Sequence, residues 1–583
     1  MCSIEGTTNV DYDISKFSDL NKCRGPDGTH FFKDDKVNFA HNLLEISPNP
    51  KRKIQPYVTE KGNVLVFNGE IYGLYENQWD VEWLANIIEN NGIQRLKEGV
   101  NGMWALAWYE PAKNKLTLCR DHFGIKPLYY TQIESGFYFS STLPPLAGLH
   151  YEEYEEKISY SGYYYDQIYK FCDGFNPGKE TILHDINKLY PGQIIELDVV
   201  TNKITRKNSL WDSNWKNKTN FLWNKWELDE KLSNYISQVT NAPGIKKTIS
   251  LSGGLDSNLI ASISRNKDRI SASSVHWEDK NIGESDPSRH MMDELALSKE
   301  TTKWLNMDHY VTTIPHDNDE FHDEVYNAMF GIPSWDIQRL LPRFYNITQA
   351  AKNGNRIYIT GDCADEILTG YNGDFKMHSN GVMDINQLFR VLGYKSEKEP
   401  DHKFCGSREV GRMTNKDIWG DCNINNRQLL QLLYHCDGFC TVLDHMCGYY
   451  GMEARVPFLH QDLVKYLISI PGQQKLQISF DKIEQSSMET KQEREEYIYF
   501  MMGHYKGILR EHMSHHYTPG VRNRMRKTGF SNPWDARDAE KNKNLRYASY
   551  DVQKNKLKSN AVDFKDNLLY NLYHDIKTEN ING

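Results

Sequence analysis

Residues 248–263 place a strand, a tight turn and a helix in immediate succession, and this order constrains the fold more than any other stretch. Residues 248–252 read Thr-Ile-Ser-Leu-Ser, Gly253 and Gly254 form the turn, and an amphipathic helix follows. Because the two glycines carry no Cβ, the backbone can bring its N–H groups close to an anion. The helix adds unpaired N–H groups and the positive end of its dipole. We therefore expect a phosphate-binding loop in a parallel α/β sheet.

Polar side chains around the two glycines make this prediction more specific. Ser252 and Ser257 offer hydroxyl donors to phosphate oxygens, and Asp256 can hold a divalent cation against them. No lysine follows the glycines, so this is not the Gly-x-x-x-x-Gly-Lys-Ser/Thr loop. A double glycine alone would be better interpreted as an ordinary strand-to-helix turn, but the flanking Ser, Asp and Ser favour phosphate.

With these residues the stretch resembles the Ser-Gly-Gly-x-Asp-Ser signature of the pyrophosphate-loop ATP hydrolases. That resemblance implies cleavage of ATP between its α and β phosphates and does not say which molecule is adenylated. The residues of the loop expected to bind ATP are Leu251, Ser252, Gly253, Gly254, Asp256 and Ser257.

The composition argues against several classes of protein. The chain has 583 residues, more than one hydrophobic core usually organises, so we expect at least two domains. A net charge of −9 gives no reason to expect nucleic acid as a partner. No apolar run approaches the ~20 residues that span a membrane, and the amino terminus lacks the features of a signal peptide. Ten cysteines without a Cys-x-x-Cys pair are typical of reduced thiols, which predicts a cytoplasmic protein.

The amino terminus offers a candidate nucleophile, because the chain begins Met-Cys-Ser-Ile. Removal of the initiator methionine would leave the Cys2 thiol beside its own α-amine, whose pKa near ~8 suits a general base. Such a pair suits acyl transfer from an amide. Later, a short apolar strand runs into Asn68 and Gly69, whose side-chain amide and backbone N–H can form an oxyanion hole. Taken singly, Cys2 would be an incidental residue of a frayed terminus and Asn68-Gly69 a hairpin turn.

Several landmarks of the first two hundred residues occur together. They are the initial Met-Cys and the stretches Arg24-Gly-Pro-Asp27, Asn68-Gly-Glu-Ile-Tyr72 and Arg120-Asp-x-x-Gly-x-x-Pro-Leu-Tyr129. In this order they resemble the N-terminal-nucleophile glutaminase domain of the class B, glutamine-hydrolysing asparagine synthetases. The resemblance implies Cys2 as the nucleophile, and Asn68 with Gly69 as the oxyanion hole. The residues that it implies for binding glutamine are Asn68, Glu70 and Asp80.

Two positions depart from the family's pattern. Ser3 stands where the family has glycine, which adds a side chain where the backbone passes close to the substrate. Leu43 stands where the family has an arginine that clamps the α-carboxylate of glutamine. A neutral leucine cannot make that charge-assisted pair. Either glutamine binds weakly, or a nearby cation substitutes; the candidates are Lys51, Arg52 and Lys53.

A second group of candidate residues follows a later strand. Residues 356–360 read as a buried strand and lead into Gly361-Asp-Cys-Ala-Asp-Glu366. Ligands of open α/β sheets gather beyond the carboxyl ends of the strands, so this acidic stretch should face the Ser-Gly-Gly loop. Three carboxylates in five residues repel one another unless a cation or hydrogen bonds hold them. An acidic helix N-terminus is the alternative interpretation.

This stretch and two later ones also resemble the asparagine synthetase family. The resemblance implies that Asp256 and Asp365 bind Mg²⁺ and that Asp362 acts near the adenylated intermediate. It further implies that Lys506 contacts pyrophosphate, where an ammonium would neutralise charge on the leaving group. The other residues expected to bind ATP are Val275 and Gly361, and the matching stretches are 361–371, 453–459 and 505–511.

These observations together predict an α/β protein of two domains. We expect an N-terminal-nucleophile αββα glutaminase domain at 1–205 and a parallel-sheet, pyrophosphate-loop synthetase domain at 226–583. The predicted activity is glutamine-dependent synthesis of asparagine from aspartate and ATP through aspartyl-AMP, with release of AMP, pyrophosphate and glutamate. Left open are the same chemistry on another carboxylate, an impaired glutaminase that leaves free ammonia as the nitrogen source, and a non-catalytic homologue. The sequence also leaves open whether the chain forms a homodimer.

Overall fold

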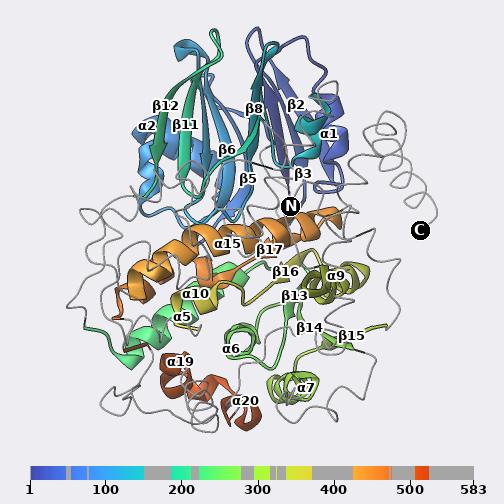
Figure 1. Ribbon diagram of the computed structural model, residues 1–583, viewed down its shortest axis with the longest axis vertical. Coiled ribbons are helices and arrows are strands. Elements are labelled where there is room, and N and C mark those ends of the chain that lie inside the picture. Colours follow the sequence, from blue (N-terminus) through green and yellow to red (C-terminus); the bar gives the residue numbers. More distant parts are fainter. Residues whose placement is uncertain are drawn as a thin grey trace, which may run out of the picture.

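The computed structural model contains an antiparallel sandwich and a parallel α/β unit, which meet along one long helix (Figure 1). It describes residues 2–46, 54–74, 78–149, 181, 185–211, 222–277, 294–315, 324, 328, 337–370, 424–471, 474–475 and 506–523. Within these ranges no helix is both long and apolar enough to cross a membrane.

The first antiparallel sheet contains the amino-terminal strand. Its strand order is β10-β8-β9-β1-β3-β2, with bounds Ile186–Lys188, Tyr129–Ile133, Gly136–Ser140, Ser3–Thr7, Asn38–Leu43 and Gly28–Lys33. Successive side chains of a strand point to opposite faces, which gives β3 two apolar faces. Phe39 packs inward against the second sheet, and Ala40 packs outward toward the helices on the other face. Those helices are α1 (Ser15–Leu20) and α3 (Pro144–Ala147).

The second antiparallel sheet packs on the inner face of the first. Its order is β12-β11-β7-β6-β5-β4, with bounds Lys203–Ser209, Gln193–Asp198, Lys115–Arg120, Gly102–Glu110, Val64–Ile71 and Tyr57–Val58. Val64 and Val66 join the core between the sheets, whereas Leu65 and Phe67 pack outward against α2 (Asp80–Asn91). The layers therefore run helix, sheet, sheet, helix, which confirms the predicted αββα arrangement. Residue 205, where the predicted first domain ends, falls inside β12.

The second part of the chain forms a five-stranded sheet in which every neighbouring pair is parallel. Its order is β15-β14-β13-β16-β17, with bounds His309–Ile314, Ile270–Trp277, Lys247–Ser250, Ile357–Ile359 and Glu453–Arg455. Ile249 lies opposite Ile359, so the loops that follow β13 and β16 meet at one edge. This confirms the predicted parallel sheet.

Helices surround this sheet in Figure 1. The longer ones are α5 (Lys225–Thr240), α6 (Leu255–Ser264), α7 (Glu294–Leu305), α9 (Ile337–Lys352) and α16 (Gln461–Ser469). The shorter elements are η1 (Ile93–Lys97) and η2 (Pro111–Lys113) in the sandwich, and α10 (Ala364–Ile367), η7 (Pro457–Leu459), α19 (Gly507–His512), η10 (Ser514–His516) and α20 (Pro519–Asn523) in the α/β unit.

Helix α15 (Ile424–Tyr449) lies between the sandwich and the parallel sheet (Figure 1) and carries a buried aspartate toward the sandwich. Asp444 Oδ2 lies 2.5 Å from Nη2 of Arg24, and its Oδ1 lies 3.4 Å from Nζ of Lys126. Burial alone would raise the pKa of Asp444, but the two cations outweigh burial, and the pKa is lowered. The carboxylate is therefore held ionised in the interior by both basic side chains.

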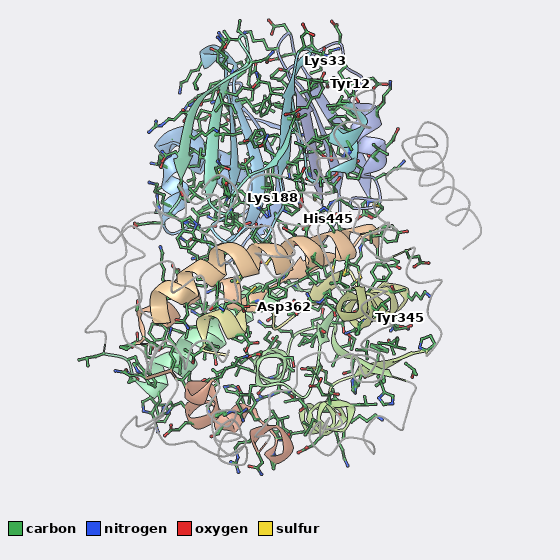
Figure 2. The ribbon with its side chains drawn as sticks, viewed as in Figure 1. Tyr12, Lys33, Lys188, Tyr345, Asp362 and His445 are labelled. Carbon is green, nitrogen blue, oxygen red and sulfur yellow. The ribbon has the colours of Figure 1, made fainter. Side chains whose placement is uncertain are left out.

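A second aspartate, which lies earlier in α15, repeats this arrangement. Asp437 lies 2.8 Å from Nη2 of Arg120 and 2.5 Å from Nζ of Lys188. Figure 2 shows Lys188 on the sandwich side of α15 and Asp362 on the side of the parallel sheet. Lys126 also reaches β17, where its Nζ lies 3.0 Å from Oε2 of Glu453. Arg24, Arg120 and Lys126, which belong to the motifs at 24–27 and 120–129, thus bind the sandwich to the second part of the chain.

We predict that Asp444→Asn strongly destabilises the protein. The substitution leaves Arg24 and Lys126 buried without a full counter-charge, and breaking a buried pair in this way costs about 3–5 kcal/mol. The shift of the urea unfolding midpoint measures the effect. Glu227→Gln is the control, because its 3.8 Å contact with Lys231 lies at the surface and should change stability by under about 0.5 kcal/mol. Equal midpoints for the two variants would contradict the prediction.

Candidate active sites

The Cys2 thiol lies just before β1, and Figure 1 marks the amino terminus at the end of the sandwich that faces α15. The residue is buried, with an exposure of 8%. The backbone N–H of Leu44 donates to the sulfur at 3.4 Å, and the Leu44 carbonyl oxygen lies 3.9 Å away. These contacts hold the sulfur beside the end of β3, and a nucleophile must be positioned in this way.

The two departures from the family's pattern lie near the thiol. Ser3 is fully buried, and its hydroxyl accepts a hydrogen bond of 3.0 Å from Nδ2 of Asn42, its partner on β3. The added side chain is therefore held by the neighbouring strand. Leu43 is the last residue of β3 and is half-buried. The candidate substitute cations at 51–53 lie outside the described residues, so Leu43 remains the departure that bears on glutamine.

A buried carboxyl group on β1 was not identified from the sequence. Oε1 of Glu5 accepts a hydrogen bond of 2.7 Å from Nδ2 of Asn21. Burial raises the pKa of Glu5 to about 8, although hydrogen bonds from Ser3 and Asn21 and the charge of Arg24 act in the opposite direction. Glu5 is therefore mostly protonated at neutral pH. The only signal in the sequence is an acidic residue within a strand that reads Ser-Ile-Glu-Gly-Thr.

Asn68 and Gly69 lie within β5 rather than in a turn. Asn68 is fully buried, and neither atom of its side-chain amide has a hydrogen-bond partner among the described residues. A buried amide without a partner costs free energy, so such groups call for an explanation such as an absent ligand. A Cβ on Gly69 would lie 2.0 Å from the carbonyl oxygen of Met103, so only glycine fits there. The pair suits the predicted oxyanion hole.

Glu70 makes a contact that the sequence did not predict. Its Oε2 lies 2.5 Å from Nη2 of Arg455, on β17 of the parallel sheet. Arg455 also donates through Nη1 to the carbonyl oxygens of Val239 at 2.9 Å and Asn241 at 2.8 Å. Burial raises the pKa of Glu70 even though Arg455 lowers it, and the charge of Asp80 at the start of α2 adds to the rise. The two predicted glutamine-binding carboxylates thus lie near each other, and one is bonded across the domain interface.

The Ser-Gly-Gly loop connects β13 to α6, as predicted. The N–H of Ser252 donates to Oγ of Ser257, and the N–H of Gly254 donates to Oγ of Ser252, both at 3.1 Å. Nδ2 of Asn258 donates to the carbonyl oxygens of Ser252 and Gly254, both at 2.7 Å. Side chains of α6 therefore fold the loop back over the helix N-terminus, a position that favours an anion. The sequence motif does not extend to Asn258, so only the structure assigns it this role.

Val275 and Gly361 approach the loop from the two neighbouring strands. Oγ of Ser274 donates to the carbonyl oxygen of Leu251 at 2.7 Å, which ties β14 to the start of the loop, and the half-buried Val275 follows. A Cβ on Gly361 would lie 2.9 Å from Cβ of Asp256. Glycine therefore lets the loop after β16 approach the first turn of α6.

Asp256, Asp365 and Lys506 meet in one cluster, although they are far apart in the sequence. The ammonium of Lys506 contacts both carboxylates and lies 2.7 Å from Oδ1 of Asp365. Burial lowers the pKa of Lys506, but the two carboxylates outweigh burial and raise it. Two carboxylates that already share one cationic group offer the oxygen donors that Mg²⁺ prefers. The donor set therefore fits the predicted metal.

Asp362 lies beside this cluster but binds a different partner. Its Oδ1 lies 2.8 Å from Nη2 of Arg343 on α9, and its Oδ2 accepts a hydrogen bond of 2.9 Å from Oγ1 of Thr360. Figure 2 labels Asp362 below α15. Arg343 belongs to no recognisable sequence motif, so the sequence alone did not identify it. The ion pair fixes the Asp362 carboxylate at the end of β16.

The chain matches two family models in succession. Residues 1–211 match the glutamine amidotransferase domain, and residues 246–573 match asparagine synthase. Together with the sandwich and the loop, these matches define a two-domain amidotransferase. The second match spans more than half of the chain, and the protein belongs to the asparagine synthase family.

Curated relatives agree with this assignment at modest identity. The chain is 24% identical over 537 residues to glutamine-hydrolyzing asparagine synthetase 2 of Bacillus subtilis, covering 83% of this chain and 68% of the relative. It is 24% identical over 520 residues to a putative glutamine-hydrolyzing asparagine synthetase 1 of Methanocaldococcus jannaschii, covering 82% of each. It is also 24% identical over 509 residues to asparagine synthetase B of Escherichia coli, covering 82% and 76%.

The two buried asparagines near the thiol should respond differently to truncation. Asn68→Ala should leave stability nearly unchanged, because its amide bonds to none of the described residues. Asn42→Ala should cost about 1–3 kcal/mol, because its amide donates to Ser3 and Ser18 and accepts from Thr29. Urea midpoints of the two variants compare them. A large loss for Asn68→Ala would assign its amide a structural role instead.

Proposed function

We propose that the protein is a glutamine-dependent asparagine synthetase that uses aspartate, ATP and glutamine. The observation that carries the proposal is the presence of two chemically complementary sites in one chain. In the sandwich, the buried Cys2 thiol and the Asn68 amide, which has no hydrogen-bond partner among the described residues, suit the release of ammonia. In the α/β unit, the Ser-Gly-Gly loop and the carboxylate–lysine cluster suit activation by ATP. Family membership and the names of the relatives support the same conclusion.

In the glutaminase half, Cys2 attacks the side-chain amide of glutamine. Negative charge develops on the amide oxygen, where the Asn68 amide and the Gly69 N–H would stabilise it. Ammonia leaves, and water hydrolyses the resulting thioester to glutamate. Glu70 and Asp80 would bind polar groups of glutamine, and an ionised carboxylate at Asp80 suits its ammonium. The neutral Leu43 predicts weak binding of the α-carboxylate unless Lys51, Arg52 or Lys53 supplies the missing cation.

In the synthetase half, the β-carboxylate of aspartate attacks the α-phosphate of ATP to give aspartyl-AMP and pyrophosphate. The loop between Leu251 and Ser257 would bind the phosphates. Val275 on β14 and Gly361 after β16 would also contact ATP. Lys506 would neutralise charge on the leaving pyrophosphate. Ammonia then attacks the acyl adenylate and expels AMP. Asp362, positioned by its ion pair with Arg343, would act near the adenylated intermediate as ammonia attacks.

Mg²⁺ would be held by Asp256 and Asp365 and would supply charge neutralisation for the phosphates. The oxygen donor set supports this choice over a softer metal. Lys506 contacts the same two carboxylates, so cation binding and the position of the lysine ammonium would be linked.

The acceptor acid and the compartment are part of the proposal. The cysteines that the structure describes are free thiols, which supports a reducing compartment and hence the cytosol. Fractionation of the source cells would test this. ATP–pyrophosphate exchange with a panel of acids tests the acceptor, because exchange with another acid and none with aspartate would favour the alternative substrate. Product analysis with glutamine or ammonia then separates a full synthetase from one with an impaired glutaminase.

Cys2→Ala should abolish asparagine formation from glutamine and leave ammonia-dependent formation near the wild-type rate. The reason is that only the glutaminase half needs the thiol. Asparagine and glutamate are measured with each nitrogen donor. Cys23→Ala is the matched control, since that free thiol lies elsewhere in the sandwich. Loss of both activities in Cys2→Ala would refute this division of labour.

Lys506→Met should slow adenylation of aspartate about 10²–10³-fold, because one charge-stabilising donor is lost at the leaving group. ATP–pyrophosphate exchange with aspartate measures this step, and glutamine hydrolysis should continue. Lys231→Met, on the exposed side of α5, controls for a general loss of positive charge. Unchanged exchange in Lys506→Met would remove the lysine from the mechanism.

A further inference from the structure

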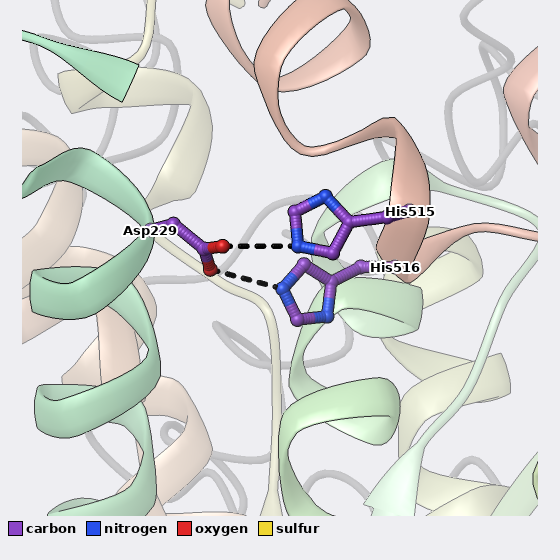
Figure 3. Close-up of side chains that lie close together, drawn as sticks. All are labelled: Asp229, His515 and His516. Atoms are coloured by element: carbon purple, nitrogen blue, oxygen red, sulfur yellow. Dashed lines mark hydrogen bonds and ion pairs between the residues drawn. The ribbon is translucent and has the colours of Figure 1, made fainter. Parts of the chain in front are cut away.

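Two histidines and an aspartate converge at a second site, which contacts Ser262 near the C-terminal end of α6, whereas the Ser-Gly-Gly loop precedes the N-terminus of that helix. Oδ2 of Asp229 lies 3.0 Å from Nε2 of His515, and its Oδ1 lies 3.2 Å from Nε2 of His516. Figure 3 shows both imidazole rings, which come from η10, directed at the Asp229 carboxylate on α5. One ligand atom from each residue falls within 4.8 Å of the others. None of the three takes part in the proposed synthesis.

The spacing of these atoms is close to that of a tetrahedral metal site. Ligands about 2.0–2.1 Å from Zn²⁺ lie roughly 3.3 Å apart when the angle between them is tetrahedral. The separations of 3.0 and 3.2 Å, each between one imidazole Nε2 and a different oxygen of the Asp229 carboxylate, are near this value. His515 is 55% exposed, so its ring can turn to complete the geometry, and an ion can enter from solvent.

A second interaction orients one of the rings. Nδ1 of His516 lies 3.0 Å from Oγ of Ser262 on α6. Histidines that bind metals usually engage their other ring nitrogen in such a hydrogen bond, which fixes the ring. The arrangement therefore leaves Nε2, rather than Nδ1, directed at the shared point. Burial lowers the pKa of His516, and the hydrogen bond to Asp229 acts in the opposite direction. The positive charge of Arg265 has a smaller effect that opposes a cation here, and the Asp229 carboxylate offsets it.

We propose that Asp229, His515 and His516 form a binding site for a divalent first-row transition metal, with Zn²⁺ as the best match. Imidazole and carboxylate are ligands that Zn²⁺ accepts, and three protein ligands leave a fourth position for water. The bound ion would join η10 to α5 and, through Ser262, to α6. Asp256 lies in the first turn of α6, and α19, just before η10, follows Lys506. The ion would therefore fix the relative position of two elements of the ATP site.

Metal binding to the metal-stripped full-length protein tests this proposal. Zn²⁺ titration of the wild type should show one bound equivalent. Ser262→Ala removes only the orienting hydroxyl and should lower the Zn²⁺ affinity about 10–100-fold. His515→Ala and Asp229→Asn each remove a ligand and should lower the affinity by more than this. His515 is exposed, so its substitution should leave the fold intact. His512→Ala is the control, because that ring packs on Trp223 instead, with centroids 5.2 Å apart.

Two further readouts separate this site from binding to cysteine thiolates, which are a common class of zinc ligand. The Co²⁺ adduct should show the visible bands of tetrahedral nitrogen and oxygen ligation, and these should disappear in His515→Ala. Zn²⁺ should also raise the melting temperature of the wild type and of His512→Ala, but not of His515→Ala. Equal Zn²⁺ affinity in wild type and His515→Ala, or a cobalt spectrum of thiolate ligation alone, would overturn the proposal.

Discussion

The buried ion pairs of α15 are the interaction on which the rest of the structure depends. Asp437 and Asp444 each bind two cations of the sandwich in a region from which water is excluded. Such pairs add little net stability compared with apolar packing, but they tolerate no misalignment, because a displaced partner leaves an uncompensated charge. The pairs therefore fix how the sandwich sits on the parallel sheet. That position in turn decides which groups of the two sites face each other.

Both candidate sites follow from the same structural rule, which places reactive groups at the ends of strands. Cys2 precedes β1, while the Ser-Gly-Gly loop and Asp362 follow β13 and β16. The surrounding elements hold these groups with short local bonds, such as those of Asn258 to the loop and Arg343 to Asp362. Preorganisation of this kind lowers the reorganisation needed when charge develops during a reaction.

The fold and most of the candidate site residues could be predicted from the sequence, because short motifs with fixed spacing encode strand ends and turns. The αββα layers, the parallel sheet and the meeting of Asp256 with Asp365 were predicted in this way. The residues that were missed act through partners that lie outside their own sequence motifs. Arg455, Arg343 and Asp444 find their partners only after folding, and a lone charged residue in a helix or strand does not indicate its partner.

The motifs of the sandwich also had a role that local reasoning could not supply. Arg24, Arg120 and Lys126 belong to stretches whose order suggested a glutaminase, yet their side chains bind the opposite part of the chain. Turn chemistry explains the glycines and prolines of these stretches. It does not explain the cations, whose partners lie more than 300 residues away in the sequence.

The bond between Glu70 and Arg455 has a consequence for communication between the two halves. Arg455 lies opposite Ile359 on β16, and its carbonyl oxygen accepts a hydrogen bond of 3.1 Å from the N–H of Thr360, two residues before Asp362. A change of charge at Glu70 therefore alters the electrostatic field at the strand that leads to Asp362. If ligand binding in one half changes the affinity of the other half through this link, thermodynamic reciprocity requires the same factor in the opposite direction.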